Sequence, residues 1–282
     1  MAEQRKIKIG DLEFNCRISG KENEELVVFL HGFPESSIMW TQLMISISES
    51  GFFCLAPDMR GYSEGACPKG IKNYDLKNLI KDILDLVDFL GKKKFHLVGH
   101  DWGAAIGWNI VYQNKERILS WTALSVPHSR AFGKAIKIDK VQQKKSSYIK
   151  WFLLPWLPEV YIRRNDFKMF KRLWKHSDKE EVEEYLRVFR QNKCLTGALN
   201  YYRANLGRGK RVPIGTVDTP TLFIWGNKDL AVGSFAAYEN DKYVKGDYKF
   251  VEVEGGHWLV QTNFIEVEKA LKSHLNTYKS LD

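Results

Sequence analysis

The residues of this chain best suited to chemistry are Gly99-His100-Asp101-Trp102-Gly103. They follow the apolar run 95–98 and open the segment 104–112, which is rich in small and apolar residues. A strand, a sharp turn and a helix in this order are typical of a turn that exposes its central side chain to a substrate. Here that side chain is the carboxylate of Asp101. A carboxyl group with an ordinary pKa of about 3.9 is ionised at neutral pH and needs no base to act as a nucleophile.

The type of nucleophile restricts the substrate. A carboxylate that attacks a saturated carbon forms an ester, and water can then hydrolyse that ester at the carbonyl of the enzyme. A hydroxyl nucleophile would instead form an ether, which is hard to cleave. We therefore expect a substrate with an electrophilic carbon and a leaving group, such as an epoxide or an alkyl halide. Taken alone, Asp101 also fits a simpler interpretation as a turn or N-cap residue, where Asp is favoured.

Two further strands end at residues that would complete a charge relay. The apolar run 221–226 leads into Asp229, and the run 248–253 leads into Gly255-Gly256-His257. In this chain order Asp101 is the nucleophile, Asp229 the orienting acid and His257 the base. Each residue alone is more typical of an ordinary loop. Three such residues at the ends of strands, in this order, favour a catalytic triad.

A loop suited to bind an oxyanion follows the apolar run 26–30. It reads His31-Gly32-Phe33-Pro34-Glu35-Ser36. An oxyanion hole uses backbone N–H groups of such a loop and of the residue after the nucleophile. We therefore predict that the amides of Phe33 and Trp102 form the hole. The alternative is a plain turn before a helix. His31 and His100 are interpreted as residues that structure their loops.

Together these motifs resemble the α/β-hydrolase-fold epoxide hydrolases, the family that includes the soluble epoxide hydrolases. The resemblance covers nearly the whole chain and is carried by five segments: His31-Gly32-Phe33-Pro34, Asp58-Met59-Arg60-Gly61-Tyr62-Ser63, Gly99-His100-Asp101-Trp102-Gly103-Ala104, Asp229 and Gly256-His257-Trp258. It implies a cofactor-free enzyme without a metal. It also implies two lid tyrosines that bind the epoxide oxygen. Tyr202 in the segment 197–203 and Tyr148 in the segment 146–152 match these positions, and with Phe33 and Trp102 they would contact substrate.

Other families share the same turn, namely haloalkane dehalogenases, fluoroacetate dehalogenases and coelenterazine luciferases. Phe33 occupies the position where haloalkane dehalogenases and the luciferases commonly carry a residue with a side-chain amide. Trp102 occupies the position where fluoroacetate dehalogenases carry an Arg. An opening epoxide develops an alkoxide, and a tyrosine with a pKa of about 10 is a suitable donor. The resemblance thus implies conversion of lipid or other apolar epoxides to vicinal diols through an ester on Asp101. The alternatives are a haloalkane dehalogenase, a luciferase-like oxidase, or a receptor that binds an apolar ligand without turnover.

The elements that position these residues alternate between short apolar runs and long amphipathic segments. The runs 7–9 and 12–18 predict an antiparallel pair at a sheet edge, and strands are expected at 26–30, 52–56, 95–98, 118–126, 221–226 and 248–253. Helices are expected at 75–90 and 261–278. This pattern predicts an α/β-hydrolase fold with a mostly parallel twisted sheet flanked by helices.

The segment between the sixth and seventh strands differs from the rest. It shows no strand signal, and Pro155 and Pro158 interrupt its helices. We predict a core at 1–126 and 220–282, with a helical lid at 127–219. Residues 128–215 contain 21 Lys and Arg but only 8 Asp and Glu. This charge is interpreted as a solvated surface. Alternatively, it attracts carboxylate-bearing epoxides or an anionic membrane.

Composition excludes several classes. The chain has 282 residues, a net charge of +9 and four cysteines: Cys16, Cys54, Cys67 and Cys194. The cysteines lack paired spacing, which argues against a disulfide framework or a zinc site. No apolar run follows the N-terminus, so a cytoplasmic protein without integral membrane contact is expected. Nucleic-acid binding is not expected, because the basic residues have no motif context. The sequence leaves the oligomeric state open.

Overall fold

The computed structural model describes residues 2–207 and 214–280, and within these residues the strands form one eight-stranded sheet. The strand order is β1-β2-β4-β3-β5-β6-β7-β8. The bounds are β1 Glu3–Ile9, β2 Leu12–Ser19, β3 Glu25–Leu30, β4 Phe52–Pro57, β5 Phe95–His100, β6 Ile118–Leu124, β7 Thr221–Gly226 and β8 Tyr248–Val253. β1 pairs with β2 and β2 with β4 in antiparallel fashion, and all other pairs are parallel. The predicted α/β class with a mostly parallel sheet is confirmed.

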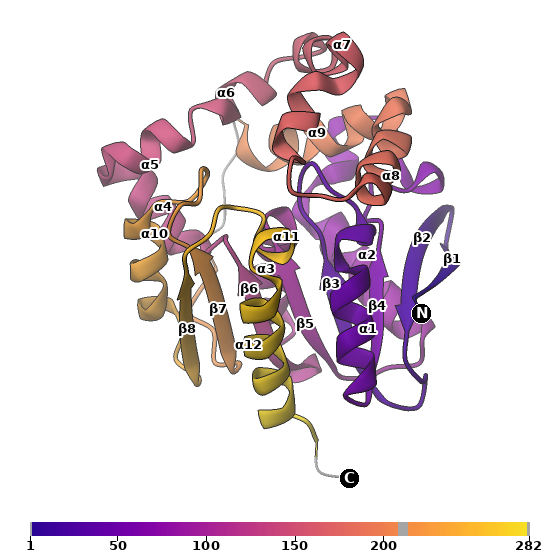
Figure 1. The fold of residues 1–282 in the computed structure, drawn as a ribbon, viewed down its shortest axis with the longest axis vertical. Coiled ribbons are helices and arrows are strands. Elements are labelled where there is room, and N and C mark those ends of the chain that lie inside the picture. Colours follow the sequence, from indigo (N-terminus) through magenta and orange to yellow (C-terminus); the bar gives the residue numbers. More distant parts are fainter. Residues whose placement is uncertain (1, 208–213, 281–282) are drawn as a thin grey trace.

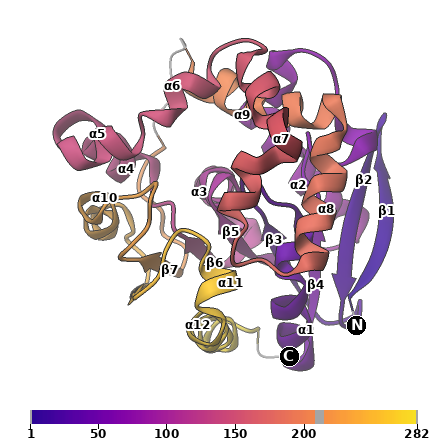
Figure 2. The same cartoon turned by 45° about the horizontal axis from the view of Figure 1, so that its top comes forward.

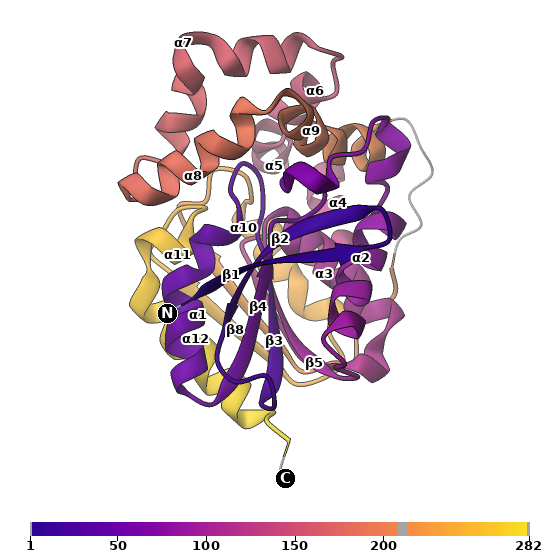
Figure 3. The same ribbon diagram turned by 90° about the vertical axis from the view of Figure 1, so that its right-hand side faces the viewer.

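Helices cover both faces of the sheet, which explains why the central strands are continuous apolar runs. Figure 3 shows α1 (Thr41–Glu49) and α12 (Phe264–Thr277) on one face, and α2 (Leu76–Phe89) and α3 (Trp102–Gln113) on the other. The fit of α3 against β6 is close. A Cβ atom at Gly107 would lie 2.0 Å from the ring of Trp121. The indole of Trp108 donates to the carbonyl of Val126 at 3.0 Å.

Between β6 and β7 the described residues form six helices. They are α4 Ser129–Ile138, α5 Lys140–Lys145, α6 Tyr148–Phe152, α7 Leu157–Leu173, α8 Lys179–Arg190 and α9 Asn192–Leu206. Figure 1 places α5 to α9 above one end of the sheet, and Figure 2 shows an arc from α5 through α6 to α8. α7 is interrupted, because residues 164–167 have non-helical backbone angles. α4 packs beside α10 (Ser234–Tyr238). Between β6 and β7 the described residues contain only a single bridge, from Val217 to Val244.

α9 is the helix of this layer that is fixed most closely to the core. The hydroxyl of Tyr201 donates to the carbonyl of Arg60 at 2.6 Å. The side chain of Asn205 accepts from the amide of Leu76 at 2.9 Å. The sulfur atoms of Cys194, on α9, and Cys67, in the loop after β4, lie 2.7 Å apart as free thiols. These contacts tie the start and the end of α9 to the segment 60–76.

The expectation of one helix over 261–278 is corrected. The chain forms α11 (Leu259–Thr262) and α12, with Asn263 between them at φ −133° and ψ 40°. Asn favours such breaks because its side chain competes for backbone hydrogen bonds. The remaining short helices are of 3-10 type: η1 Ser37–Trp40, η2 Glu64–Ala66, η3 Ile71–Tyr74, η4 Lys115–Arg117 and η5 Glu239–Tyr243. In the part of the chain that is described, no helix combines the length and hydrophobicity needed to cross a bilayer.

Candidate active site

Asp101 lies at a turn with an unusual backbone. Its φ of 51° and ψ of −115° place it between the end of β5 and the start of α3. A non-glycine residue in this region is strained, and such strain gathers at functional sites. The neighbouring glycines allow the turn to approach β3: a Cβ at Gly103 would lie 2.1 Å from the carbonyl oxygen of Leu30. A Cβ at Gly32 would lie 2.3 Å from that of Asp101. The predicted turn geometry is therefore present.

The carboxylate of Asp101 has a partner on each oxygen. Its Oδ1 accepts from the backbone N–H of Phe33 at 2.8 Å. Its Oδ2 lies 3.5 Å from Nε2 of His257. Burial raises the pKa of the Asp101 carboxyl, but the hydrogen bond and charge of His257 outweigh it, so the pKa lies below its usual value. Asp101 is therefore ionised at neutral pH, as a nucleophile requires.

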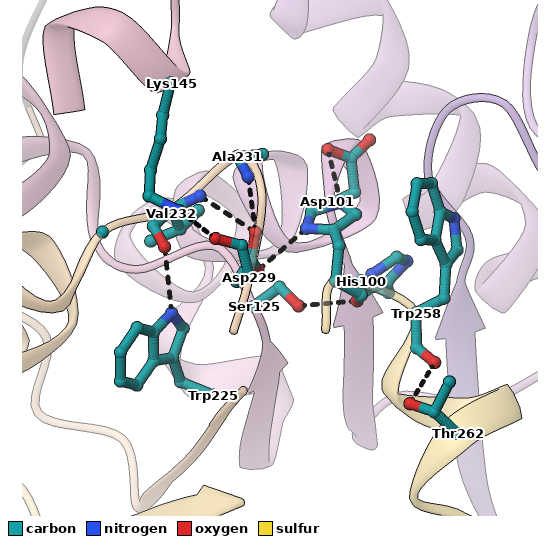
Figure 4. Close-up of polar contacts among 12 residues, drawn as sticks. His100, Asp101, Ser125, Lys145, Trp225, Asp229, Ala231, Val232, Trp258 and Thr262 are labelled. Carbon is teal, nitrogen blue, oxygen red and sulfur yellow. Dashed lines mark hydrogen bonds and ion pairs between the residues drawn. The ribbon is translucent and has the colours of Figure 1, made fainter. Parts of the chain in front are cut away.

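Asp229 holds His257 from the other side. Nδ1 of His257 lies 2.9 Å from Oδ2 of Asp229. The other oxygen, Oδ1, accepts from the amides of Ala231 at 2.7 Å and Val232 at 3.0 Å (Figure 4). Burial alone would lower the pKa of the His257 imidazole, but the charges of Asp229 and Asp101 carry it well above its usual range. His257 thus lies between two carboxylates, and their charges favour its protonated form.

Several contacts that support the site, and the residues Ser125, Glu35 and Lys145 that take part in them, were not predicted. The backbone carbonyl of His257 accepts from His100 Nε2 at 2.9 Å and from the Ser125 hydroxyl at 3.0 Å (Figure 4). Nδ1 of His100 lies 3.4 Å from the fully buried Glu35 carboxylate. Lys145 donates to the carbonyl of Asp229. Glu35 belongs to the loop motif that follows β3, so a signal for it existed, whereas Ser125 and Lys145 stand in no recognisable pattern.

His31 and His100 have the structural surroundings expected of them. Nε2 of His31 accepts from the amide of Met59 at 3.1 Å, and its Nδ1 lies 3.0 Å from the carbonyl of Gly32. His31 thus connects the loop after β3 to the loop after β4. His100 acts through the backbone of His257, as described above.

The two predicted tyrosines lie together above the triad residues. Tyr148 begins α6 and Tyr202 lies on α9, with ring centroids 6.4 Å apart and an edge-to-face arrangement. The ring of Tyr202 also packs edge to face on Trp102 at 5.1 Å and on Phe33 at 5.5 Å. Burial is the main cause that raises the pKa of both phenols; the negative charge of Asp101 is the next cause for Tyr148, while for Tyr202 it follows the neighbouring phenol of Tyr148. Both tyrosines therefore remain O–H donors at neutral pH.

All seven predicted residues thus gather at one end of the sheet, from the loop after β3 to the loop after β8 and from two helices of the upper layer. The arrangement brings together a buried carboxylate, a histidine paired with a second carboxylate, a backbone amide donor and two phenols. Trp102 opens α3, so its amide lies among the unpaired N–H groups of the helix N-terminus. Within residues 2–207 and 214–280, no group of three His, Cys, Asp or Glu residues is placed to hold a metal ion.

Comparison with known proteins identifies the family. The profile of the α/β hydrolase fold matches residues 25–264. The chain is 35% identical over 268 residues to epoxide hydrolase 4 of Homo sapiens, covering 91% of this chain and 74% of that protein. It is 32% identical over 260 residues to the AB hydrolase superfamily protein YfhM of Bacillus subtilis, covering 90% and 91%.

Comparison with solved structures supports the same family. An epoxide hydrolase of Bacillus megaterium in complex with an inhibitor superposes with a TM-score of 0.88 at 27% identity, covering 96% of this chain and all of that one. An epoxide hydrolase from metagenomes of hot environments gives a TM-score of 0.87 at 27% identity, covering 98% and 99%. The fold and site thus define a member of the α/β-hydrolase fold family. Within that family the chain belongs to the epoxide hydrolases, which are enzymes.

Proposed function

We propose that the protein converts epoxides to vicinal diols through a covalent ester on Asp101. In the first step the hydroxyls of Tyr148 and Tyr202 bind the epoxide oxygen, and Asp101 attacks a ring carbon from the opposite side. The bond from that carbon to the epoxide oxygen breaks, and a tyrosine proton passes to the developing alkoxide. Attack and proton donation act together, so no free alkoxide forms among the aromatic side chains of the site.

In the second step His257 takes a proton from water, and the resulting hydroxide attacks the ester carbonyl. The amides of Phe33 and Trp102 stabilise the oxyanion, and the Phe33 amide already donates to Oδ1 of Asp101 at 2.8 Å in the resting site. The carbonyl–oxygen bond to the substrate breaks, the leaving alkoxide takes the proton that His257 removed from water, and the diol leaves. The Asp101 carboxyl, now protonated, returns its proton through His257 to the tyrosinate left by the first step, so every group regains its starting state. Asp229 keeps the imidazole oriented through its 2.9 Å contact with Nδ1.

Charge couples the two steps. In the resting site Asp101 is one of the carboxylates that raise the pKa of His257. Esterification removes that negative charge, so the pKa of His257 falls at the moment when an unprotonated base is needed. The ester therefore makes His257 ready for the second step.

We further propose that residues 127–219 act as a lid and that the substrate is apolar. The two phenols come from this segment, and aromatic rings surround them. Phe152 packs on Tyr148 at 5.4 Å and on Tyr202 at 4.9 Å between ring centroids. Such a lining favours lipid or aryl epoxides over small polar ones. The two phenols are also the features that favour an epoxide over an alkyl halide, since a departing halide has no need for a proton.

The observation that carries the proposal is the buried Asp101 carboxylate facing His257 and the Phe33 amide. A single turnover in heavy-oxygen water tests it. The first diol should contain no heavy oxygen, and the label should appear in the peptide that contains Asp101. Label in the first diol would show direct attack of water. Release of halide from haloalkanes, without diol formation from a panel of lipid and aryl oxiranes, would favour the dehalogenase instead.

A variant gives an independent check of the ester. In His257→Gln the first step should proceed while ester hydrolysis slows by about a thousandfold, because the general base is absent. Intact-mass spectrometry should then show protein heavier by the mass of one substrate. Asp101→Asn, the matched control, should gain no mass.

A further inference from the structure

The outer end of the helical layer carries a dense group of exposed apolar side chains. All five lie in the connection between α6 and α7 and in the first turns of α7, which Figures 1 and 3 place at the end of the molecule farthest from the sheet. We call them the lid tip: Leu154 (41% exposed), Trp156 (64%), Leu157 (43%), Val160 (49%) and Tyr161 (53%). Neighbouring exposed apolar residues in such number mark an interaction surface, whereas single ones are ordinary.

The backbone at the lid tip favours exposure of its tryptophan. Trp156 has φ 50° and ψ −30°, in the left-handed region where a bulky residue is strained. Pro155 and Pro158 stiffen the segment on both sides. The nearby ring of Tyr161 packs edge to face on Trp151 at 5.4 Å, so its position is also defined. The chain thus accepts backbone strain while leaving a large indole in water, which packing of this protein alone does not explain.

Positive charges flank the lid tip in the sequence. Lys150, Arg164 and Lys168 are exposed, and none of them has a salt-bridge partner among the described residues. The acidic residues nearby are neutralised. Glu159 accepts two hydrogen bonds from Arg203, at 2.7 Å and 2.8 Å. Asp166 accepts from Lys171 at 2.5 Å and from Arg190 at 3.3 Å. The segment 150–168 therefore combines exposed apolar side chains with exposed cations that lack a salt-bridge partner among the described residues.

We propose that the lid tip docks this enzyme on the surface of anionic phospholipid bilayers. Tryptophan and tyrosine settle at the level of lipid headgroups, and basic side chains bind the anionic headgroups around them. The charge argues against a second copy as the occupant, because a symmetric contact would place the same cations opposite one another. Docking is peripheral and does not depend on the proposed reaction.

Docking would serve the proposed function by location. α6 carries Tyr148 at its first residue and leads directly into the lid tip. A bilayer in contact with the tip therefore lies beside the helix that contributes to the candidate site. Apolar epoxides concentrate in bilayers, so they would reach the site without crossing water.

Vesicle sedimentation tests the proposal without any substrate. We expect the protein to sediment with vesicles of phosphatidylcholine and phosphatidylserine, to stay in solution with phosphatidylcholine alone, and to dissociate at high salt. The double variant Lys150→Ala/Lys168→Ala should bind about thirtyfold more weakly, since each basic residue near an anionic surface contributes about fivefold. The double variant Trp156→Ser/Leu157→Ser should lose at least about tenfold.

Matched controls come from the core. Ile265→Ser removes an apolar side chain that is 74% exposed on α12, and Lys8→Ala removes an exposed cation on β1; both should bind vesicles as the parent does. All variants should keep the circular dichroism spectrum and the turnover of a water-soluble epoxide. Equal vesicle binding by the lid-tip variants and the parent would overturn the proposal. So would a concentration-dependent dimer that the Trp156→Ser/Leu157→Ser change abolishes, because the tip would then be a contact between copies.

Discussion

The carboxylate of Asp101 is held by one backbone amide, from Phe33, and one imidazole, from His257. This small number of contacts has a consequence for reactivity. Each additional strong donor would stabilise the negative charge and weaken the nucleophile. The strained backbone at φ 51° is also part of this arrangement, since it turns the side chain away from α3 and toward the loop after β3.

Loss of one phenol should slow ring opening. In Tyr202→Phe we expect formation of the Asp101 ester to slow by about a hundredfold, because a general acid typically contributes that much. Tyr148→Phe should have a smaller effect, because Tyr202 is the more deeply buried of the two. Rapid mixing followed by acid quench and mass spectrometry measures the rate. Tyr161→Phe, at an exposed tyrosine outside the site, serves as control, and an unchanged rate in Tyr202→Phe would remove the tyrosine from the mechanism.

The pH dependence of ester hydrolysis should reveal the role of Asp229. The charge of Asp229 raises the pKa of His257, and in the ester it is the remaining carboxylate in contact with that imidazole. Asp229→Asn should therefore lower the pKa of His257, and the acidic limb of the rate should move to lower pH, because the unprotonated base then persists there. The maximum rate should also fall, since Asn orients the imidazole less well. Stopped-flow rates across pH measure both effects; an acidic limb that does not move would contradict the assignment.

Most of the candidate site could be predicted because its residues follow strands. Asp101 directly follows β5, Asp229 and His257 lie in the loops after β7 and β8, and parallel strands bring their carboxyl ends to one edge of the sheet. Ser125 and Lys145 could not be predicted, because each acts only through a backbone carbonyl. The three-dimensional path of the chain alone decides which carbonyl a side chain meets.

At the scale of elements, the strands were predicted well and the helices less so. A buried strand is an uninterrupted apolar run, so its position in the sequence is evident. The break at Asn263 was missed because residues on either side of it continue a helical pattern. The helices between β6 and β7 were predicted only as a group. Their aromatic residues face one another as well as the core, which obscures a simple period. The division at 126/127 and 219/220 stays a prediction.

The close packing of α9 against the loop after β4 and against η3 can be tested by substitution. A Cβ at Gly197 would lie 2.7 Å from the hydroxyl of Tyr74 and 2.8 Å from Cα of Gly61. Gly197→Ala should therefore lower the free energy of unfolding by about 1–3 kcal/mol, as overpacking does. The matched control is Gly133→Ala in α4, where a Cβ meets nothing within 4 Å. That change should raise stability by up to about 1 kcal/mol, because Ala favours helices. Urea denaturation measures the free energy of unfolding of both variants. A Gly197→Ala variant more stable than the parent would show that α9 is not tightly packed at this position.

At the scale of the whole molecule, charge is distributed unevenly. Residues 128–215 hold 21 basic and 8 acidic side chains, while the rest of the chain holds 22 and 26. The basic segment is also the one that contributes Tyr148 and Tyr202 to the candidate site. If this charge attracts anionic substrates over a long range, as proposed, the attraction should weaken as salt shortens the range of the field.

A matched pair of substrates measures this attraction. For a fatty-acid epoxide we expect kcat/KM to fall by about threefold to tenfold between low and physiological salt. The methyl ester of the same epoxide should show no such change. Both are assayed without vesicles and below the concentration at which they aggregate, so docking plays no part. Equal salt dependence of the two substrates would mean that the basic surface is only solvated.

The neighbouring thiols of Cys67 and Cys194 offer a way to cross-link α9 to the core. Oxidised glutathione, by accepting two hydrogen atoms from this pair, would join them as a disulfide and fasten α9, which carries Tyr202, to the loop after β4. Diol production that survives this cross-link would mean that ligands enter and leave past α6 and α7 while α9 stays still. If diol production stops on oxidation and resumes after reduction, α9 must move for ligands to enter or leave the site.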